Sequence, residues 1–310
     1  MRKLRYHLVD VFTNRQFGGN PLAVFTNGRG ISTETMQAIA KELNLSETTF
    51  VLPLDDAAND YRVRIFTPGA ELPMAGHPTV GTTFVLAREH MIERGSTDGA
   101  ETEIKLEEGV GTIPVRIRWR GGEAGFIQMR QPRPTFGARV EDVEAVAEML
   151  SVAPEEITAT NLPLEVVSCG VPFFYVPLKS LRAVQNIKFR IDVWERKLKD
   201  TIPPEVFVFT REVEFEGSTV HSRMFAPGMG IWEDPATGGA SGPLGSYLVR
   251  YGVVACADNG AAEFTSEQGI EMGRPSFIRI KIAREGEEIT DVRVGGECRF
   301  MGEGYLEIED

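Results

Sequence analysis

Cysteine and histidine are scarce in this chain of 310 residues, which has three of the first and four of the second. Cys169, Cys256 and Cys298 lie far apart and form no Cys-x-x-Cys pair, so the spacing predicts neither a disulfide framework nor a zinc knuckle. The four histidines are His7, His77, His90 and His221. Because they are scattered along the chain, we expect no metal site built from several histidines.

The chain also lacks the apolar segments that membranes and secretion require. No run of about 18 apolar residues is present to span a bilayer. The first residues, MRKLRYHLVDVF, contain no apolar core of about 7 to 15 residues before a cleavage site, so they do not resemble a secretory signal. We therefore expect a cytoplasmic protein with no membrane partner.

Clustered basic residues and nucleotide-binding motifs are missing as well. The net charge of −12 argues against a nucleic-acid partner, because phosphate contacts need grouped Lys and Arg. There is no GK[ST] loop and no Gly-x-Ser-x-Gly elbow. The string GMGIWE at 228–233 begins like a dinucleotide-binding loop but ends in Glu and lacks the strand-turn-helix context. We expect neither a nucleotide nor a hydride-carrying cofactor.

The chain does contain one sequence motif, typical of a strand followed by a helix, that occurs twice. Residues 64–81 read RIFTPGAELPMAGHPTVG, and residues 223–238 read RMFAPGMGIWEDPATG. The matched pairs are Arg64 with Arg223, Phe66 with Phe225, Pro68 with Pro227 and, after a shortening of the loop, Pro78 with Pro235 and Gly81 with Gly238. In this alignment His77 falls opposite Asp234.

A second pair of segments, GNPLAVF at 19–25 and GVPFFYV at 170–176, agrees in the same order and at a similar separation. With 42% hydrophobic and 25% charged residues, the composition is that of a globular protein. We therefore predict a duplicated fold with an N-terminal half at 1–131 and a C-terminal half at 132–310. The last strand, at about 298–308, could pack back on the first half.

Hydrophobic periodicity predicts strands and helices alternating in both halves. Expected strands cover 6–12, 22–25, 48–52, 61–66, several segments within 102–130, and then 164–177, 205–210, 219–225, 263–267, 276–283, 289–294 and 298–308. Expected helices begin after Ser32, at Pro78, at Glu141 and at Pro235, since Pro suits the first helical turn. The helix that begins at Pro78 is apolar on most sides, which indicates burial within its half.

The two matched turns differ in their polar residue, an imidazole at His77 and a carboxylate at Asp234. Packing of duplicated halves about a pseudo-two-fold axis would turn both toward one cleft. A helix N-terminus has unpaired N–H groups and a partial positive charge, so the amides near Gly76 and Gly238 would bind a carboxylate and stabilise an enolate-like charge. The simpler alternative is that His77 and Asp234 only cap their helices.

Glu47 is the third candidate for chemistry. It lies between a helix end and the apolar strand 48–52, where partial desolvation would raise the pKa of its carboxyl group toward the range useful for general acid–base catalysis. The alternative is that Glu47 is an ordinary solvated surface residue.

Several motifs together resemble the phenazine-biosynthesis PhzF-like isomerase family. They are DVFT at 10–13, GGNPLAV at 18–24, NLSET at 44–48, FTP at 66–68, GHPT at 76–79 and EDPATG at 233–238. The resemblance spans most of the chain. It implies an α+β fold of the diaminopimelate epimerase-like class, with two pseudo-symmetric halves that each roll a mainly antiparallel sheet around a central helix.

The resemblance also implies roles for individual residues. Glu47 would shuttle the proton, while His77 and Asp234 would position the substrate and assist the transfer. Candidates for substrate binding are Asn20, Ser46, Gly76, Thr237, Gly238 and Gly239. The family implies no metal, no organic cofactor and a homodimer. Where the family often has Ser after EDPATG, this chain has Gly239, which keeps an N–H but offers no hydroxyl.

Our leading hypothesis is a cofactor-independent isomerase that moves a proton on a small carboxylate-bearing substrate by acid–base catalysis at the cleft between the halves. Epimerases of the wider fold carry Cys at both matched turns, so His77 and Asp234 argue against a two-thiol mechanism. An epimerase or dehydratase acting on a small acid shares the first step and is one alternative. A non-catalytic protein that binds small carboxylates is the other.

Overall fold

The computed structural model describes residues 1–227 and 230–309. Gly228 and Met229, which begin the string GMGIWE, lie outside the described residues. The chain divides into two compact units, one of Met1–Arg130 with Val294–Asp310 and one of Gln131–Arg293. The first unit is therefore completed by a returning C-terminal segment.

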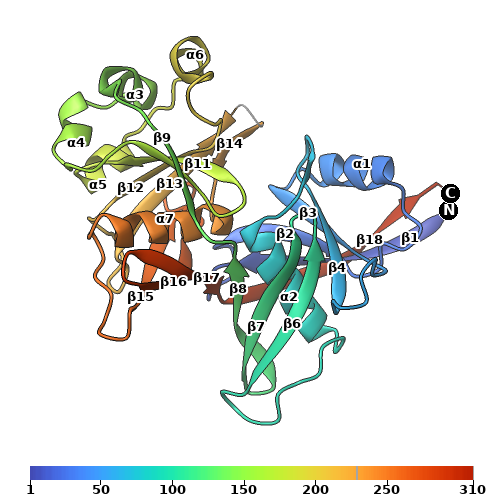
Figure 1. The fold of residues 1–310 in the computed structure, drawn as a ribbon. Helices are drawn as coiled ribbons and strands as arrows, with labels where there is room; N and C mark the ends of the chain where they lie inside the picture. Colours follow the sequence, from blue (N-terminus) through green and yellow to red (C-terminus); the bar gives the residue numbers. More distant parts are fainter. Residues whose placement is uncertain (228–229, 310) are drawn as a thin grey trace. The chain divides into compact units, whose positions relative to one another are not determined.

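The first unit is built on one mixed sheet (Figure 1). Its strands are β1 (Arg2–Val11), β2 (Asn20–Phe25), β3 (Glu47–Leu52), β4 (Tyr61–Phe66), β6 (Glu101–Glu108), β7 (Gly111–Arg120), β8 (Glu123–Gln131) and β18 (Cys298–Ile308). They pair in the order β18-β1-β2-β3-β4-β6-β7-β8, parallel only at β2/β3 and β4/β6. The short β5 (Glu71–Leu72) adds antiparallel to the end of β4.

Two helices cover opposite faces of this sheet. Helix α1 (Thr33–Leu43) begins at Ser32, whose side chain accepts a hydrogen bond from the N–H of Thr35, and its apolar side packs on aromatic residues of β2, β3 and β4. Helix α2 (Gly76–Arg88) is buried along almost its whole length and contacts β1, β2 and β3. Gly81 permits this close approach, because a Cβ there would lie 2.6 Å from Leu22 and 2.7 Å from Val11.

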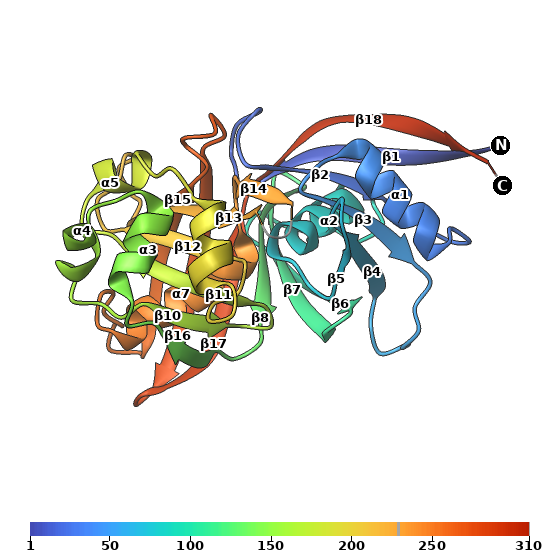
Figure 2. The same cartoon turned by 90° about the horizontal axis from the view of Figure 1, so that it is seen from above.

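The second unit repeats the plan with a larger helical layer (Figure 2). Its strands are β9 (Thr135–Arg139), β10 (Glu165–Ser168), β11 (Pro172–Pro177), β12 (Val206–Thr210), β13 (Val220–Ala226), β14 (Ile231–Asp234), β15 (Ala261–Gln268), β16 (Ser276–Glu285) and β17 (Glu288–Gly296). Its helices are α3 (Val143–Leu150), α4 (Pro154–Thr158), α5 (Leu181–Gln185), α6 (Ile191–Val193), a π-helical turn (Trp194–Leu198) and α7 (Gly238–Arg250).

Alternate residues of the strands separate two cores in the second unit. Phe174, Val176 and Val208 face the layer that contains α3, whereas Tyr175 stacks on Tyr247 of α7. Helix α7 contains several Gly and an interior Pro, a poor helical composition, yet its residues from Gly238 to Val249 are all buried. Tertiary packing therefore compensates for weak helix propensity.

The strand pairing confirms the duplication. In the first unit β1, β2, β3, β4 and β6 pair antiparallel, parallel, antiparallel and parallel, and in the second unit β10, β11, β12, β13 and β15 do the same. The central helices α2 and α7 occupy the same place in this order. The expected α+β class, with a central helix in each unit, is thus confirmed.

The starts of the central helices differ from the prediction. We expected both helices to begin at a proline, but α2 begins two residues before Pro78 and α7 begins three residues after Pro235. Pro78 is tolerated inside the first turn because its missing N–H needs no acceptor there. Hydrogen bonds hold Asp234–Thr237 as a turn, which delays the start of α7. The helix expected from Glu141 begins at Val143, because Asp142 is its N-cap.

Candidate active site

His77 and Glu47 meet in the first unit. His77 is the second residue of α2, and Glu47 is the first residue of β3. His77 Nε2 lies 3.2 Å from Glu47 Oε2, and the two residues are only 2% and 8% exposed. The pair is therefore a nearly water-free contact between an imidazole and a carboxyl group.

Asn20 orients the imidazole. It begins β2, is fully buried, and its amide Nδ2 lies 3.1 Å from His77 Nδ1. Donation from the amide to Nδ1 leaves the ring proton on Nε2, where it faces Glu47. Burial lowers the pKa of His77 to about 3, so the ring is neutral at physiological pH. The neutral ring therefore lies 3.2 Å from Glu47 without adding a positive charge, and the contact does not have the geometry of a hydrogen bond.

The first turn of α2 contains a second buried carboxyl group. The hydroxyl of Thr79 lies 2.6 Å from the carbonyl oxygen of Ala75 and 2.6 Å from Oε1 of Glu108, the last residue of β6. Burial raises the pKa of Glu108 to about 8. Glu108 was not among the residues we predicted, because a Glu at the end of an alternating strand usually faces solvent.

The matched turn of the second unit is organised around Asp234. The hydroxyl of Thr237 donates to Oδ2 of Asp234 over 2.6 Å. Gln268, the last residue of β15, donates from Nε2 to the carbonyl oxygen of Asp234 and to the Thr237 hydroxyl, and its Oε1 accepts the N–H of Thr237. Asp234 is 5% exposed. One amide side chain thus holds the whole turn in place.

Helix α7 starts directly after this turn. Thr237 is its N-cap, and Gly238 and Gly239 are its first two residues. The carbonyl oxygen of Gly238 accepts a hydrogen bond from Gln131 over 2.9 Å. The N–H groups of Gly238 and Gly239 precede the first intrahelical acceptor, whereas that of Ala240 donates to the carbonyl oxygen of Thr237, so the two glycine amides can receive an anion.

Within each unit, the structure brings together most of the residues that the sequence predicts. Asn20, Glu47 and His77 are in contact, and Gly76 begins the helix that carries His77. Ser46 is half-buried immediately before Glu47. The second unit groups the remaining four, Asp234, Thr237, Gly238 and Gly239, at one turn.

Gln268 and Glu108 were missed, although the repeat could have revealed both. In the parallel pairing of β4 with β6, Arg62 lies opposite Glu107, and in β13 with β15, His221 lies opposite Glu267. Extending the alignment one residue along each strand sets Glu108 against Gln268. The signal was available, but it required strand register in addition to sequence similarity.

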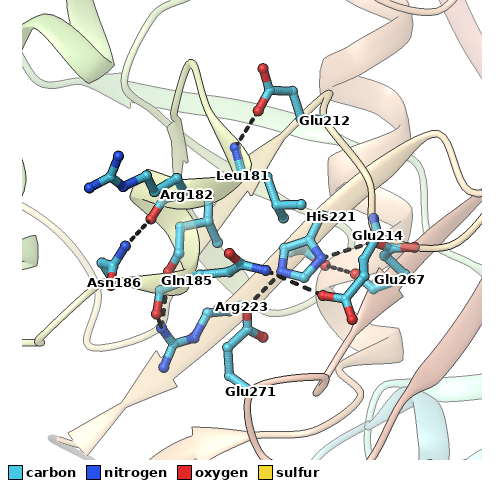
Figure 3. Close-up of polar contacts among 12 residues, drawn as sticks. Leu181, Arg182, Gln185, Asn186, Glu212, Glu214, His221, Arg223, Glu267 and Glu271 are labelled. Carbon is cyan, nitrogen blue, oxygen red and sulfur yellow. Dashed lines mark hydrogen bonds and ion pairs between the residues drawn. The ribbon is translucent and has the colours of Figure 1, made fainter.

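His221 of β13 contacts two carboxylates in the second unit (Figure 3). Its Nδ1 lies 2.9 Å from Glu267 and its Nε2 lies 2.8 Å from Glu271. Burial by itself lowers the pKa of His221, but the hydrogen bonds to the two carboxylates outweigh it and raise the pKa to about 9. Glu267 also accepts the backbone N–H groups of Glu214 and Phe215. His221 is therefore a buried imidazolium that ties β13, β15 and the 211–219 loop together.

In each unit, an ion pair between an arginine and a glutamate supports the loop before the central helix. Arg223 of β13 binds Glu233 of β14 with two hydrogen bonds of 2.8 Å. Its guanidinium group also donates to the backbone carbonyl oxygens of Val184 and Gln185 at the end of α5 (Figure 3). Arg64 of β4 binds Glu71 of β5 with two hydrogen bonds of 2.6 Å. Bidentate pairs of this type fix the orientation of the loop that leads into each central helix.

Among the described residues, one group has the spacing of metal ligands, namely His7, Glu89 and Glu303. Arg5 already bridges both carboxylates through its guanidinium group. This cation offsets part of the negative charge of the two carboxylates, and no contact joins the cluster to Glu47 or His77 in the part of the chain that the structure describes. Among the described residues, no helix is long and apolar enough to cross a membrane.

The chain belongs to the family described as phenazine biosynthesis-like proteins, whose model matches residues 9–304. It is 36% identical to the trans-2,3-dihydro-3-hydroxyanthranilate isomerase of Pseudomonas aeruginosa, over 97% of this chain and 98% of that protein. Other relatives with more than 30% identity are also named isomerases. The protein is therefore a small-molecule isomerase of this family.

Solved structures agree with the assignment. A phenazine biosynthesis protein of the PhzF family from Bacillus anthracis superimposes with a TM-score of 0.86 and 27% identity, covering 99% of this chain and 100% of that one. A probable proline racemase from Agrobacterium radiobacter has a TM-score of 0.67 at 12% identity, with 99% and 93% covered. This second likeness shows the fold alone, and it confirms that the fold is shared with racemases and epimerases.

Proposed function

We propose that the protein is a cofactor-independent isomerase that moves a proton between two carbons of a small carboxylate-bearing substrate. The observation that supports this proposal is the buried contact between Glu47 and a neutral His77. A carboxyl group can act as a base when it is ionised and as an acid once it has taken up a proton, so one residue can remove and return the proton in a single catalytic cycle. No redox step or group transfer is needed for such a shift.

In the proposed reaction, the Glu47 carboxylate removes a proton from a carbon that is activated by the conjugated acid group. The electron pair of the broken C–H bond moves into the conjugated system, and the protonated Glu47 returns the proton to a different carbon. His77 lies beside Glu47 as a neutral ring, with Nε2 at 3.2 Å from Oε2, and in the proposed reaction it would turn its Nε2–H toward the carboxylate without placing a positive charge beside it. Atoms and charge balance within one substrate molecule.

The N-termini of the central helices would bind the substrate carboxylate. The amides at Gly76, Gly238 and Gly239 belong to first helical turns, where N–H groups lack intrahelical acceptors. Asp234 would hold a polar group of the same substrate. The Thr237 hydroxyl donates to the carboxylate of Asp234, and Gln268 donates to its backbone carbonyl oxygen. This proposal requires Asp234 and Glu47 to act on one molecule, which a double-mutant cycle tests.

Thiol chemistry fits the site poorly. Burial raises the pKa of Cys169 to about 12 and also raises that of Cys298, so both thiols are protonated at neutral pH. Neither cysteine lies at a matched turn. We therefore propose double-bond migration in preference to a two-thiol epimerisation, and product analysis separates migration from inversion or loss of water.

The decisive experiment follows deuterium uptake. Cyclic and unsaturated acids, beginning with trans-2,3-dihydro-3-hydroxyanthranilate, are incubated with the enzyme in deuterated water, and label at carbon is measured by NMR. We expect Glu47→Gln to reduce uptake by about 10²- to 10⁴-fold, the usual contribution of a positioned acid–base group. The control is Glu42→Gln on the exposed side of α1, which should behave like the wild type. Equal uptake by the Glu47→Gln variant would exclude Glu47 from the role.

The same panel tests the non-catalytic alternative, because binding of a carboxylate without label uptake or product would favour it. We also propose that the protein is a cytoplasmic homodimer, as the family resemblance implies. Sedimentation velocity at micromolar concentration would check the dimer, and a monomer under those conditions would contradict it.

A further inference from the structure

The Thr79 hydroxyl has one hydrogen but two close oxygen neighbours. It lies 2.6 Å from the carbonyl oxygen of Ala75 and 2.6 Å from Oε1 of Glu108. Both distances are those of strong O–H···O hydrogen bonds, so two hydrogens are needed for the two contacts. The carbonyl of Ala75 cannot donate. If Thr79 donates to Ala75, the second hydrogen must belong to the carboxyl group of Glu108.

The surroundings of Glu108 also favour the neutral form. The residue is 6% exposed, and within the described part of the chain its Oε2 has no hydrogen-bond partner. An unpaired carbonyl-type oxygen costs far less when buried than an unpaired carboxylate oxygen.

Charged side chains on the neighbouring elements are engaged elsewhere. Arg62 on β4 pairs with Asp55 and with Glu107, the residue that precedes Glu108 on β6. His77 on α2 lies against Glu47 on β3. No ion pair of Glu108 with a cation occurs among the residues the structure describes, so nothing there offsets the cost of a buried negative charge.

The duplicated unit provides an independent comparison. Gln268 has the same register position in β15 that Glu108 has in β6. Its neutral amide donates to the Thr237 hydroxyl over 2.9 Å, close to the start of α7. A protonated carboxylic acid resembles a carboxamide in shape and likewise carries one donor and one acceptor side. Glu108 and Gln268 therefore have matching roles. Glu108 holds Thr79 in the first turn of α2, and Gln268 holds Thr237 directly before α7.

We propose that Glu108 is a positioning residue that works as a neutral carboxylic acid, whose proton holds Thr79 and thereby the first turn of α2 that carries His77. The proposal rests on the proposed function only for its effect on activity. Because the pKa of Glu108 is about 8, the proton leaves in mildly alkaline solution. The donor to Thr79 is then lost, and the first turn of α2 has to readjust around a buried charge.

The first test reads His77 directly, without any substrate. Histidine is labelled with ¹⁵N, and the ring resonances of His77 are followed from pH 6.5 to 9.5 in the wild type, in Glu108→Gln and in the control Glu103→Gln, an exposed carboxyl on the same strand. His77 itself does not titrate in this range, since its own pKa is about 3. We expect a step near pH 8 in the wild type and in the control, and no step in Glu108→Gln. Absence of the step in the wild type, or its persistence in Glu108→Gln, would overturn the proposal.

The second test uses stability. The pKa of Glu108 is raised from 4.5 in the unfolded chain to about 8, so the unfolded state loses the proton first and stability falls as pH rises between these values. The ratio of the unfolding constants of the wild type and Glu108→Gln should rise on the order of tenfold per pH unit between about pH 5 and pH 8. A flat ratio in urea titrations would contradict a neutral Glu108 whatever the activity of the enzyme.

The activity measurement separates this inference from the proposed function. Glu108→Gln should keep deuterium exchange at pH 7 within about threefold of the wild type and lose the decline above pH 8, whereas Thr79→Val should lower exchange at every pH. If the NMR and stability results hold but no substrate exchanges, the positioning role stands and the proposed reaction fails. If exchange occurs and its alkaline decline survives in Glu108→Gln, the positioning role fails.

Discussion

The turns before α2 and α7 have a common support but carry different reactive groups. An arginine–glutamate pair leads into each helix, Arg64 with Glu71 and Arg223 with Glu233. A cation on the preceding strand also pairs with a glutamate that accepts two backbone N–H groups, Glu107 in the first unit and Glu267 in the second. The two units therefore share these supporting ion pairs, although their central helices begin at different positions relative to the matched prolines.

The polar groups at the two turns differ. In the first unit Glu47 faces the neutral imidazole of His77. Glu205 immediately precedes β12 at the matching point of the strand ladder, and burial raises its pKa, yet within the described part of the chain its Oε2 has no partner. Asp234 is instead enclosed by Thr237 and Gln268. Under the proposed function, Glu47 of the first unit would move the proton and Asp234 would hold a polar group of the substrate.

Of the substitutions that test this difference between the two units, removal of the His77 imidazole should have the largest effect on activity. We expect His77→Gln to lower kcat by about 100-fold, since the donor that would orient Glu47 is lost from a buried site. KM should change little, because the substrate carboxylate would still meet the helix N-termini. Steady-state kinetics at pH 7 would measure both constants, and a rise in KM with unchanged kcat would assign His77 to binding alone.

The pH dependence of stability should distinguish the His221–Glu267 pair of the second unit from the Arg62–Glu107 pair at the matching position of the first. A pKa raised from 6.5 to about 9 means that the stability contributed by the imidazolium is complete below about pH 6.5 and is lost as pH rises through 9. His221→Gln should therefore lower the free energy of unfolding by about 2 kcal/mol at pH 6 and by much less at pH 9.5.

The control for His221→Gln is its counterpart in the first unit, Arg62→Gln. Because arginine stays charged, and because this pair is partly exposed, the loss should be about 0.5 to 1 kcal/mol at both pH values. Urea unfolding of both variants provides the comparison. A pH-independent loss for His221→Gln would show that the buried imidazolium is not the source of its effect.

The smallest effect on activity is expected from a substitution that makes the second unit resemble the first. Gln268→Glu gives the second unit the carboxyl group that the first unit has at Glu108. We expect activity to fall by about tenfold at pH 8 and by less at pH 6, where the new acid would be protonated and could still donate to Thr237. A pH–rate profile of this variant would check the expectation, and a uniform loss at all pH values would argue against equivalence of the two positions.

The sequence alone predicted the duplicated fold, several strands and the three central site residues. The alignment of RIFTP with RMFAP predicted the duplication, and alternating apolar residues predicted β3, β4, β12 and β13 to within one residue. The motifs NLSET, GHPT and EDPATG indicated Glu47, His77 and Asp234. Such features are local, so they survive in a one-dimensional pattern.

Other features were missed because they depend on contacts between distant segments. Asn20 was predicted only as a substrate-binding residue, and its contact with Nδ1 of His77, 57 residues further along, was not foreseen. Gln268 reaches back 34 residues to Asp234. The short helices α4, α5 and α6 were not predicted, because they contain too few residues to show a helical period.

The amino-acid sequence by itself determined that the chain is a doubled α+β fold and that an acid and an imidazole stand near the two matched turns, since repeats and residue types are properties of the chain alone. Only the tertiary structure decided the protonation of those groups. A pKa depends on what surrounds a group, and burial makes His77 neutral, whereas paired carboxylates keep His221 charged.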